Sequence, residues 1–491
     1  MMKNKRLDMV LRIATGAVLS AAGAILLINL SVLNAGGAGI APLTGAVPQT
    51  TVDTETTTSN SVVCPGSFAV LGLDPSSPDT VTPTGKPEIY TSEQLFADTT
   101  ISSTPLAQPE RIATEFEQPT VTLTTTGENQ VAAAATQKIA IETVSGQTAL
   151  SCSEAFNDQW IVAGSTTMGH TGMISLNNPG LVPATVNLTV HDETGKKDAR
   201  ASSGILIAPK SQRIVSLAGF GAGKESTVVR VESSGSPVVA SMSLTEIRDL
   251  TPTGAEQINS QAEPTQTLVF AGIVNFAEHV HSAEDADQAD EYPATLRLLA
   301  TTESVSDDWD KDSIGTSATA VIVGLTTKGE EIELAAVNLT PGVVKDTQIK
   351  ILPETVEAIV VRSQLPVVGG IKTATHSSSD HDFTWYAPSS IYGAGETMPV
   401  AAAAEAVPVI VNLSEEKATV TVTSGSAEKQ KVQEVEVAPQ ATKKLAKGVT
   451  VSVVSEGEIS AGMVIFNQKT LASYPVLKPR ESLSQLTVFP R

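Results

Sequence analysis

Apolar and polar residues alternate along much of the chain with a period of two. Residues 184–190 (Ala-Thr-Val-Asn-Leu-Thr-Val) are typical, because aliphatic side chains fill one set of alternate positions and Thr and Asn fill the other. This period places successive side chains on opposite faces of a β-strand, one buried and one solvated. Such segments recur about every 8–12 residues with Gly and Pro between them, as is usual in β-sandwiches. The pattern predicts an all-β protein.

The strand pattern occurs three times, which indicates an internal repeat. The alternating segment that begins at Ala184 recurs at Ala318 and at Ala418. In each copy a later strand ends on a proline, a strand with basic residues follows, and two more strands around a turn close the copy. These prolines are Pro209, Pro341 and Pro439. The matched order predicts three tandem immunoglobulin-like β-sandwiches, at residues 153–262, 263–378 and 379–491.

The first and third copies share features ahead of this segment. Asn178 and Asn412 each stand six residues before the alanine that begins it, and Trp160 and Trp385 are expected to open the two copies. The three prolines should lie at strand ends, because a proline inside a sheet forfeits a ladder hydrogen bond. The period of two predicts which side chains point into the cores, namely Val186, Leu188 and Val190 in the first copy and Val420 and Val422 in the third.

A long apolar run precedes the repeats. Residues 13–33 include no charged side chain over 21 positions, and about 20 apolar residues cross a bilayer as a helix. Four basic residues and one acid precede the run, and positive residues stay in the cytoplasm. We therefore expect a cytoplasmic tail at residues 1–12, one transmembrane helix at 13–33, and the bulk of the chain outside the cell membrane. A signal peptide cleaved near residues 36–38 is the alternative.

Two segments separate the predicted helix from the repeats. Residues 34–61 are rich in Gly, Thr and Pro and predict a flexible stalk. Residues 62–152 predict a loop-rich segment with short strands, because prolines interrupt the pattern between residues 75 and 119. Two alternating pieces, at 121–125 and 138–144, are its expected strands.

Cys64 and Cys152 are the two cysteines of the chain. An even pair in an exported protein predicts one structural disulfide. A reactive thiol or a metal-bound thiolate needs a neighbouring base or further ligands, and neither is apparent in the sequence. We expect the bridge to stabilise the segment ahead of the first copy.

Composition and charge exclude one class of partner. The chain is 41% hydrophobic, which suffices for packed cores, but 4% aromatic and 17% charged, with a net charge of −21. An acidic surface repels phosphate backbones, so nucleic-acid binding is not expected.

Motifs for nucleotide binding and nucleophilic catalysis are incomplete. Residues 221–227 (Gly-Ala-Gly-Lys-Glu-Ser-Thr) carry a Gly-Lys pair, but Ala218 replaces the first glycine of a phosphate loop and Glu225 replaces its Ser or Thr. We interpret them as a turn before the strand at Val228. Residues 414–417 match Ser-x-x-Lys without the companion motifs of penicillin-binding enzymes. No catalytic residue and no cofactor are predicted.

Three acidic or histidine-rich stretches could suggest metal binding. His279 and His281 lack a third fixed ligand, and residues 308–312 lack the Gly and the bidentate Glu of a calcium loop. His376, with acids at 380 and 382 and a second histidine at 381, is interpreted as part of a linker before the third copy. We expect no tight metal site.

Aromatic residues are too few for an obvious sugar-binding platform. Trp160, Trp309 and Trp385 are the only tryptophans, and the first and last fall on predicted strands, where packing in a core is expected. Paired carboxylates for glycoside hydrolysis are set by distances in space and not by spacing along the chain.

Several motifs resemble those of an actinobacterial family of exported envelope proteins. They are Cys64-Pro-Gly, the strand around Trp160, residues 177–180 (Asn-Asn-Pro-Gly) followed by 184–186 (Ala-Thr-Val), and residues 250–254 (Leu-Thr-Pro-Thr-Gly). The family is a domain of unknown function found in single-span proteins. The resemblance implies export, β structure and envelope glycan biogenesis as a context, and it carries over no catalytic residue.

These observations predict a non-enzymatic, membrane-anchored scaffold or interaction protein outside the cell membrane, with an envelope protein or glycan as partner. The alternatives are a divergent enzyme or accessory subunit of envelope glycan biogenesis, and a surface adhesin. Exposed carboxylates clustered in a pocket would favour the enzyme. An exposed apolar patch or an unpaired strand edge would favour the scaffold.

Overall fold

We describe the chain from a computed structural model. It describes residues 50–53, 61–71, 80–92, 100–109, 111–126, 132–197, 202–248, 250–275, 293–301, 317–375, 381–426, 429–448, 450–480 and 485–488. Contacts divide the chain into a unit of Met1–Thr56 with Ser482–Arg491 and a unit of Thr57–Glu481. In the first unit, β1 (Thr50–Asp53) pairs antiparallel with β35 (Gln485–Val488). All features below belong to the second unit.

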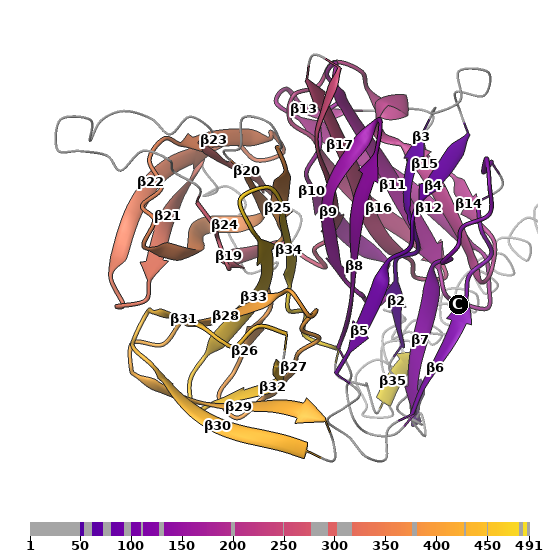
Figure 1. Ribbon diagram of the computed structural model, residues 1–491. Coiled ribbons are helices and arrows are strands. Elements are labelled where there is room, and N and C mark those ends of the chain that lie inside the picture. Colours follow the sequence, from indigo (N-terminus) through magenta and orange to yellow (C-terminus); the bar gives the residue numbers. More distant parts are fainter. Residues whose placement is uncertain are drawn as a thin grey trace, which may run out of the picture. The chain divides into compact units, whose positions relative to one another are not determined.

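Strands dominate this unit, which confirms the all-β prediction (Figure 1). The one helix within the described residues is the short 3₁₀ helix η3 (Leu217–Phe220). None of the described helices is long and apolar enough to cross a membrane. The predicted tail (1–12), membrane helix (13–33) and most of the stalk (34–61) lie outside the described residues.

Three small antiparallel sheets precede the first copy. Their orders are β2-β7-β6, β3-β4 and β5-β8-β9. The strands are β2 (Ser61–Cys64), β3 (Phe68–Leu71), β4 (Val81–Thr84), β5 (Glu88–Thr91), β6 (Thr100–Pro105), β7 (Val121–Thr126), β8 (Ala133–Ile141) and β9 (Val144–Ser151).

This part is more regular than the sequence predicts. The strand at 121–125 is confirmed as β7, but the piece at 138–144 spans the turn between β8 and β9. The prolines are tolerated because they lie on an edge strand or at a strand end, where a backbone N–H need not bond to a neighbouring strand. Pro83 lies in β4, which pairs only with β3, and Pro105 ends β6.

The first copy consists of two antiparallel sheets. One has the order β10-β16-β12, with β13 and β14 both paired to β12, and the other has the order β15-β11-β17-β18. The strands are β10 (Asp158–Val162), β11 (His170–Asn178), β12 (Ala184–Asp192), β13 (Gly195–Lys197), β14 (Ile205–Ile207), β15 (Ser211–Ser216), β16 (Val228–Gly235), β17 (Val239–Arg248) and β18 (Thr251–Asn259).

The second copy forms one seven-stranded sheet, because the 19-residue strand β24 takes part in both of its halves. One half has the order β19-β24-β21-β22 and the other β23-β20-β24-β25. The strands are β19 (Thr265–Ala271), β20 (Ala294–Ala300), β21 (Ala318–Thr326), β22 (Glu331–Leu339), β23 (Lys345–Ile349), β24 (Val356–Ala374) and β25 (Phe383–Tyr386).

The third copy again has two sheets. One has the order β27-β32-β29-β30, and in the other β31-β28-β33 continues to β34, with the short β26 also on β33. The strands are β26 (Ile391–Tyr392), β27 (Thr397–Pro399), β28 (Val407–Asn412), β29 (Ala418–Ser426), β30 (Lys429–Val437), β31 (Thr442–Lys444), β32 (Thr450–Ser455), β33 (Ile459–Phe466) and β34 (Leu471–Pro475).

The three copies have the same strand pairing, as the sequence repeat predicts. The strands that begin at Ala184, Ala318 and Ala418 are the central strands β12, β21 and β29. These alanines lie opposite Ile207, Leu339 and Val437. In every copy the predicted proline follows that partner by two residues and lies just beyond the end of the strand. The predicted inward residues of the first and third copies are all buried, namely Val186, Leu188, Val190, Val420 and Val422.

One predicted boundary feature is wrong. Trp160 lies on β10, the first strand of the first copy. Trp385, however, lies on β25, which pairs with β24 and closes the second copy instead of opening the third. The motif around Trp385 therefore marks the end of a copy, at the position that β18 and β34 hold in the others.

Candidate functional site

The last strands of the three copies meet in one place. β18, β25 and β34 pack on one another, and β9 packs on β18 and β34. Figure 1 labels β9, β25 and β34 in this region. Gly254 allows the approach of β18 to β25, because a Cβ atom there would lie 2.5 Å from the ring atom Cδ1 of Phe383. Its φ of 140° is also one that other residues rarely adopt.

A pocket of about 540 Å³ opens beside this meeting point. Segments of the N-terminal part and of all three copies line it, from the ends of β8 and β9 to the chain that follows β34. Its wall is mainly apolar, and its buried side chains include Ala133, Ala134, Leu268, Met463, Tyr474 and Val476. A pocket of this size matches those that bind small molecules, which range from about 300 to 1,000 Å³.

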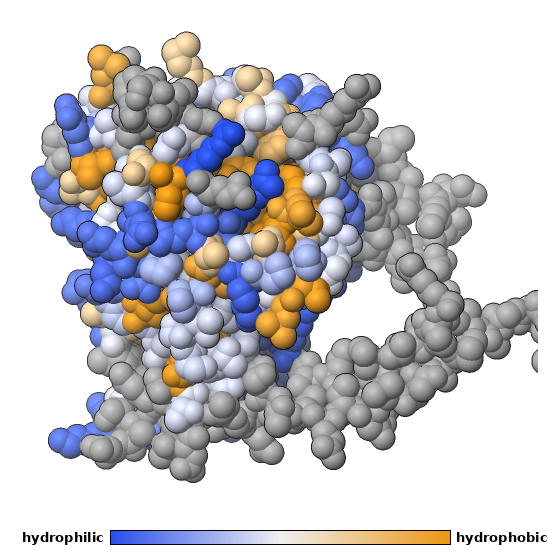
Figure 2. All heavy atoms as spheres, turned by 90° about the vertical axis from the view of Figure 1, so that its right-hand side faces the viewer, coloured by the Kyte–Doolittle hydropathy of each residue, from blue (hydrophilic) through white to orange (hydrophobic). Residues whose placement is uncertain are grey.

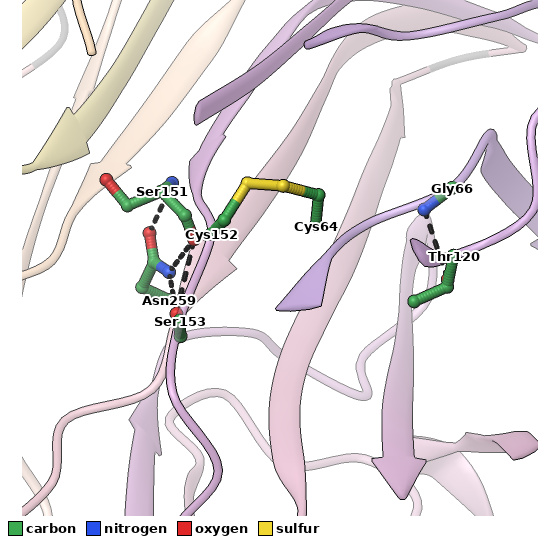
Figure 3. The surroundings of a disulfide bond; sticks show 7 residues. All are labelled: Cys64, Gly66, Thr120, Ser151, Cys152, Ser153 and Asn259. Carbon is green, nitrogen blue, oxygen red and sulfur yellow. Dashed lines mark hydrogen bonds between the residues drawn. A yellow bond between two sulfur atoms is a disulfide. The ribbon is translucent and has the colours of Figure 1, made fainter. Parts of the chain in front are cut away.

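The disulfide forms part of this wall. Cys64, at the end of β2, is bonded to Cys152, and the two Cα atoms lie 4.4 Å apart, which confirms the predicted bridge (Figure 3). Asn259 holds the chain on both sides of Cys152. Its Nδ2 donates to the carbonyl of Ser151 at 2.7 Å and to Oγ of Ser153 at 2.9 Å, while its Oδ1 accepts the N–H of Ser151 at 3.0 Å. A disulfide and three hydrogen bonds therefore hold this part of the pocket wall in place.

Charged groups line or adjoin the pocket, and Glu154 and Lys478 belong to its lining. Burial raises the pKa of Glu154, although the backbone N–H and the charge of Arg480 act in the opposite direction. The guanidinium of Arg480 lies 3.8 Å from the centre of the Phe156 ring. Lys478 forms an ion pair of 2.7 Å with Glu396. These groups suit orientation of a bound molecule by its polar end.

A second, polar pocket of about 400 Å³ lies between the first and second copies. Glu246 at this pocket contacts Lys372, and its carboxylate lies 3.7 Å from Nε2 of His170. Asp346 accepts two hydrogen bonds from Arg297, at 2.8 and 2.9 Å. Both carboxylates therefore already face cations.

Arg297 joins the two copies at this pocket. Its side chain is buried, and it donates to the carbonyls of Gly164, Thr227 and Glu225 in the first copy at 2.6–3.1 Å. Its guanidinium also lies 4.8 Å from the centre of the Trp385 ring. Because all five N–H groups of the guanidinium donate hydrogen bonds, Arg297 holds the first and second copies together.

Two buried carboxyl groups lie where the last strands meet. Asp382 precedes β25 and accepts backbone N–H groups of Gln147 on β9 at 2.9 Å, of Leu471 on β34 at 3.1 Å and of Phe383 at 3.1 Å. Burial raises the pKa of Asp382 to about 8, against the lowering effect of these donors. The Asp382 side chain, from the second copy, thus contacts both the N-terminal part and the third copy.

Glu256 on β18 is the second of these groups and is fully buried. Burial raises its pKa well above the usual value, the nearby Asp382 raises it further, and hydrogen bonds from Thr384, Gln257 and Trp385 oppose the shift. The N–H of Gln257 lies 2.7 Å from its carboxylate. Burial in this network suits a structural role, since solvent and substrate do not reach the group.

The metal-binding candidates of the sequence fall mostly outside the part of the chain that the structure describes. His279, His281, residues 308–312 and His376 lie outside the described residues. The described residues contain no group of three or more His, Cys, Asp or Glu side chains able to hold a metal ion. The linker interpretation of residues 376–382 is wrong at its end, because Asp382 is buried and anchors three strands.

The other motifs have structural roles. Residues 221–227 form the predicted turn before β16, and Lys224 forms an ion pair of 2.9 Å with Asp192. Lys417, of the Ser-x-x-Lys match, lies in a turn and pairs with Glu436 at 2.6 Å. Trp160 packs with Leu299 and Val368 between the first and second copies, and Trp309 lies outside the described residues.

Sequence reasoning missed the roles of Asn259 and Glu256, and it assigned Asp382 to a linker. Each is a single polar residue within or beside a strand, and its importance comes from strands far away in sequence. Only Glu256 could have been noticed in the sequence. It is the one charged residue among apolar and amide residues at 255–259, and a charged residue is rarely buried.

Comparison with known proteins gives a family but no activity. A family model described as a family of unknown function (DUF5719) matches residues 112–448, which is more than half of the chain. No curated protein and no solved structure matches. The matched region begins in the N-terminal part, includes the first two copies and ends just after β31 in the third. The chain therefore belongs to the family of unknown function DUF5719.

Proposed function

We propose that this chain is a non-enzymatic, membrane-anchored interaction protein of the bacterial cell envelope, and that the pocket beside the disulfide receives an apolar group of its partner. The observation that carries the proposal is the apolar pocket of about 540 Å³, built from the N-terminal part and all three copies. An exposed apolar cavity on a soluble surface is costly unless something fills it.

The chemistry of the pockets supports binding over catalysis. Acid–base catalysis needs an accessible carboxylate, histidine or lysine poised in a pocket. In the polar pocket Lys372 and His170 both lie beside the Glu246 carboxylate. Arg297 binds Asp346, so these groups are engaged with one another. Glu256 and Asp382 are buried. The apolar pocket has few charged lining residues, among them Glu154 and Lys478, and these suit recognition of a polar end.

Two features support a place outside the membrane. The Cys64–Cys152 bridge suits an oxidising compartment, because cytosolic thiols are kept reduced. The apolar run at residues 13–33, with basic residues before it, supports an anchor with the pocket on the outer side.

Binding of an apolar fluorescent probe tests the pocket. The full chain in nanodiscs is titrated with N-phenylnaphthylamine, whose emission rises in apolar surroundings, and the emission from empty nanodiscs of the same lipid is subtracted because the probe also enters the bilayer. We expect saturable binding to one site, and we expect Ile391→Glu at the pocket mouth to weaken it at least tenfold, because a carboxylate would replace an apolar contact.

Val432→Glu is the matched control, since Val432 is 62% exposed and lies on β30, away from the pocket. It should bind the probe as the unchanged chain does. Equal binding by all three proteins would contradict the assignment of the pocket.

A further inference from the structure

The turn between β11 and β12 exposes an unusual group of apolar side chains. Leu181 is 82% exposed, Val182 is 53% exposed, and Leu206 on the neighbouring β14 is 60% exposed. Pro183, next in the turn, is exposed as well. We call these four residues the apolar turn. Because Thr185 pairs with Leu206, the two segments of the apolar turn are adjacent.

The third copy contains the same turn with the same backbone contacts. Nδ2 of Asn178 donates to the carbonyls of residues 182, 207 and 208 at 2.9–3.2 Å. Nδ2 of Asn412 donates to the carbonyls of residues 416, 437 and 438 at 2.9–3.2 Å. Each asparagine also accepts the N–H two residues later, at 2.9 and 3.0 Å. The two turns are therefore equivalent residue by residue.

The loop after the proline confirms this equivalence. Lys210 and Gln440 both adopt a left-handed backbone, with φ of 52° and 49°. The N–H of Lys210 donates to the carbonyl of Gly180 at 3.2 Å, and that of Gln440 donates to Ser414 at 3.2 Å. Differences between the two turns are thus differences in side-chain chemistry alone.

All four exposed positions differ in chemistry between the copies. The third copy has charged residues where the first has the apolar turn, namely Glu415, Glu416, Lys417 and Glu436. In the second copy exposed Asn338 takes the place of Leu206. The shared backbone accepts charge at these positions, so folding does not require them to be apolar. Contiguous exposed apolar side chains on a soluble protein mark a contact surface.

Two cations border the apolar turn. Lys210 donates to the carbonyl of Pro179, and Arg213 donates to that of Leu206 at 3.1 Å. Across the described residues neither forms an ion pair with a carboxylate. The chain as a whole has a net charge of −21, so this apolar and basic surface contrasts with the rest. Figure 2 looks onto the side of the larger unit where β14 lies and shows apolar groups set among polar ones.

We propose that the apolar turn docks a short protein segment that carries aliphatic side chains flanked by carboxylates. Aliphatic groups match Leu181, Val182 and Leu206, and carboxylates match Lys210 and Arg213. Four side chains cover far less than the roughly 800 Å² per partner of a stable interface between folded proteins, which favours a segment over a second copy of the chain. This surface shares no residue with the apolar pocket, so each proposal stands or fails alone.

Fluorescence anisotropy with labelled nonapeptides tests the proposal on the full chain in nanodiscs. One peptide has a Leu/Val centre with Glu on both sides, a second has the same centre with Lys on both sides, and a third has a Ser centre with Glu on both sides. We expect the first to bind at least tenfold more tightly than the others, and we expect added salt to weaken it.

The third copy supplies the variant. Combined Leu181→Glu, Val182→Glu and Leu206→Glu gives the first copy the charges that the equivalent turn already tolerates, so the protein should keep its thermal midpoint. We expect this variant to lose binding of the acidic peptide at least tenfold and Lys210→Gln to lose part of it. Met168→Glu, at a 99% exposed position elsewhere, is the control and should bind normally.

Three outcomes would overturn the proposal: equal binding by the triple variant, equal binding of the lysine-flanked peptide, or no peptide binding. Phosphatidylglycerol vesicles form a further arm. Vesicle binding that depends on Leu181, Val182 and Leu206 without peptide binding would assign the surface to an anionic membrane instead.

Discussion

At the scale of single residues, buried polar groups are the most demanding part of this fold. A buried polar group costs free energy unless it is hydrogen-bonded, so each one present must be matched by strands around it. Asn178 and Asn412 satisfy three carbonyls each, and Asn259 holds the chain beside the disulfide. Asp382 gathers N–H groups from β9 and β34. None of these roles follows from local sequence, except the six-residue step after Asn178 and Asn412.

Replacing Asn412 with alanine should destabilise the third copy. The side chain donates to three carbonyls and accepts one N–H, and the variant would leave these buried or partly buried groups without this partner. We expect the free energy of unfolding to fall by about 2 kcal/mol, measured in a urea titration. Gln433→Ala, at an exposed position of β30, is the control and should change it little. A fall of equal size in both variants would contradict the assigned role.

The buried carboxyls predict a pH dependence of stability. Burial raises the pKa of Glu256 and raises that of Asp382 to about 8, whereas the unfolded chain releases these protons near pH 4. Native carboxyls with raised pKa keep their protons longer than the unfolded state does, so stability is greatest in acid. The contribution of these carboxyls to the free energy of unfolding is lost as the pH rises from about 4 through the folded-state pKa, which for Asp382 is about 8.

Glu256→Gln isolates this effect, because an amide of the same shape does not ionise. Thermal midpoints between pH 5 and 8 should fall less steeply for this variant than for the unchanged chain. The same slope in both proteins would show that Glu256 keeps an ordinary pKa.

At the scale of elements, the sequence predicted strands and register well wherever one face is buried. The strands at Ala184, Ala318 and Ala418 pair as expected, and Pro209, Pro341 and Pro439 end their neighbours. A one-residue slip would expose every inward side chain, so this pattern is strongly constrained.

Elements with weaker periodic patterns were predicted less well. The β8–β9 hairpin turns without the Gly or Pro that usually signals a turn, and β25 was assigned to the wrong copy. The pocket and the carboxyl pair could not be predicted, because they arise where β9, β18, β25 and β34 meet, and this depends on the packing of distant elements.

Removal of the disulfide should act locally. The small sheet β2-β7-β6 has a small apolar cluster of its own, and Cys64 and Cys152 belong to it. With Cys64→Ser and Cys152→Ser together, we expect a loss of about 2–5 kcal/mol in that part of the chain. In hydrogen exchange, amides of β2 and β7 should exchange faster while those of β29 and β30 are unchanged. Uniform acceleration in all of these strands would contradict a local role.

At the scale of the whole molecule, one strand topology occurs three times, and the copies differ in their contacts with one another and in their exposed residues. Arg297 connects the first copy to the second, and the last strands of all three copies meet around the carboxyl pair. The segments that follow these strands contribute to the lining of the apolar pocket. The three copies thus share one framework. We assign function to the exposed residues that differ between copies and to the pockets that lie between them.

The predicted orientation can be tested on the intact protein. The basic residues before position 13 predict a tail in the cytoplasm and repeats outside. An alkaline phosphatase fused after Arg491 should be active, because it needs an oxidising compartment, and a fluorescent protein that folds only in the cytoplasm should stay dark. The opposite pair of results would reverse the orientation.

Photo-crosslinking in intact cells tests the central claim, which is that the pocket receives a partner, most directly. A photoreactive amino acid replaces Ile391 at the pocket mouth in one strain and Val432 on β30 in another. The account predicts a discrete adduct from position 391 that is absent from position 432 and competed by N-phenylnaphthylamine. The same adducts from both positions, or none from position 391, would contradict it.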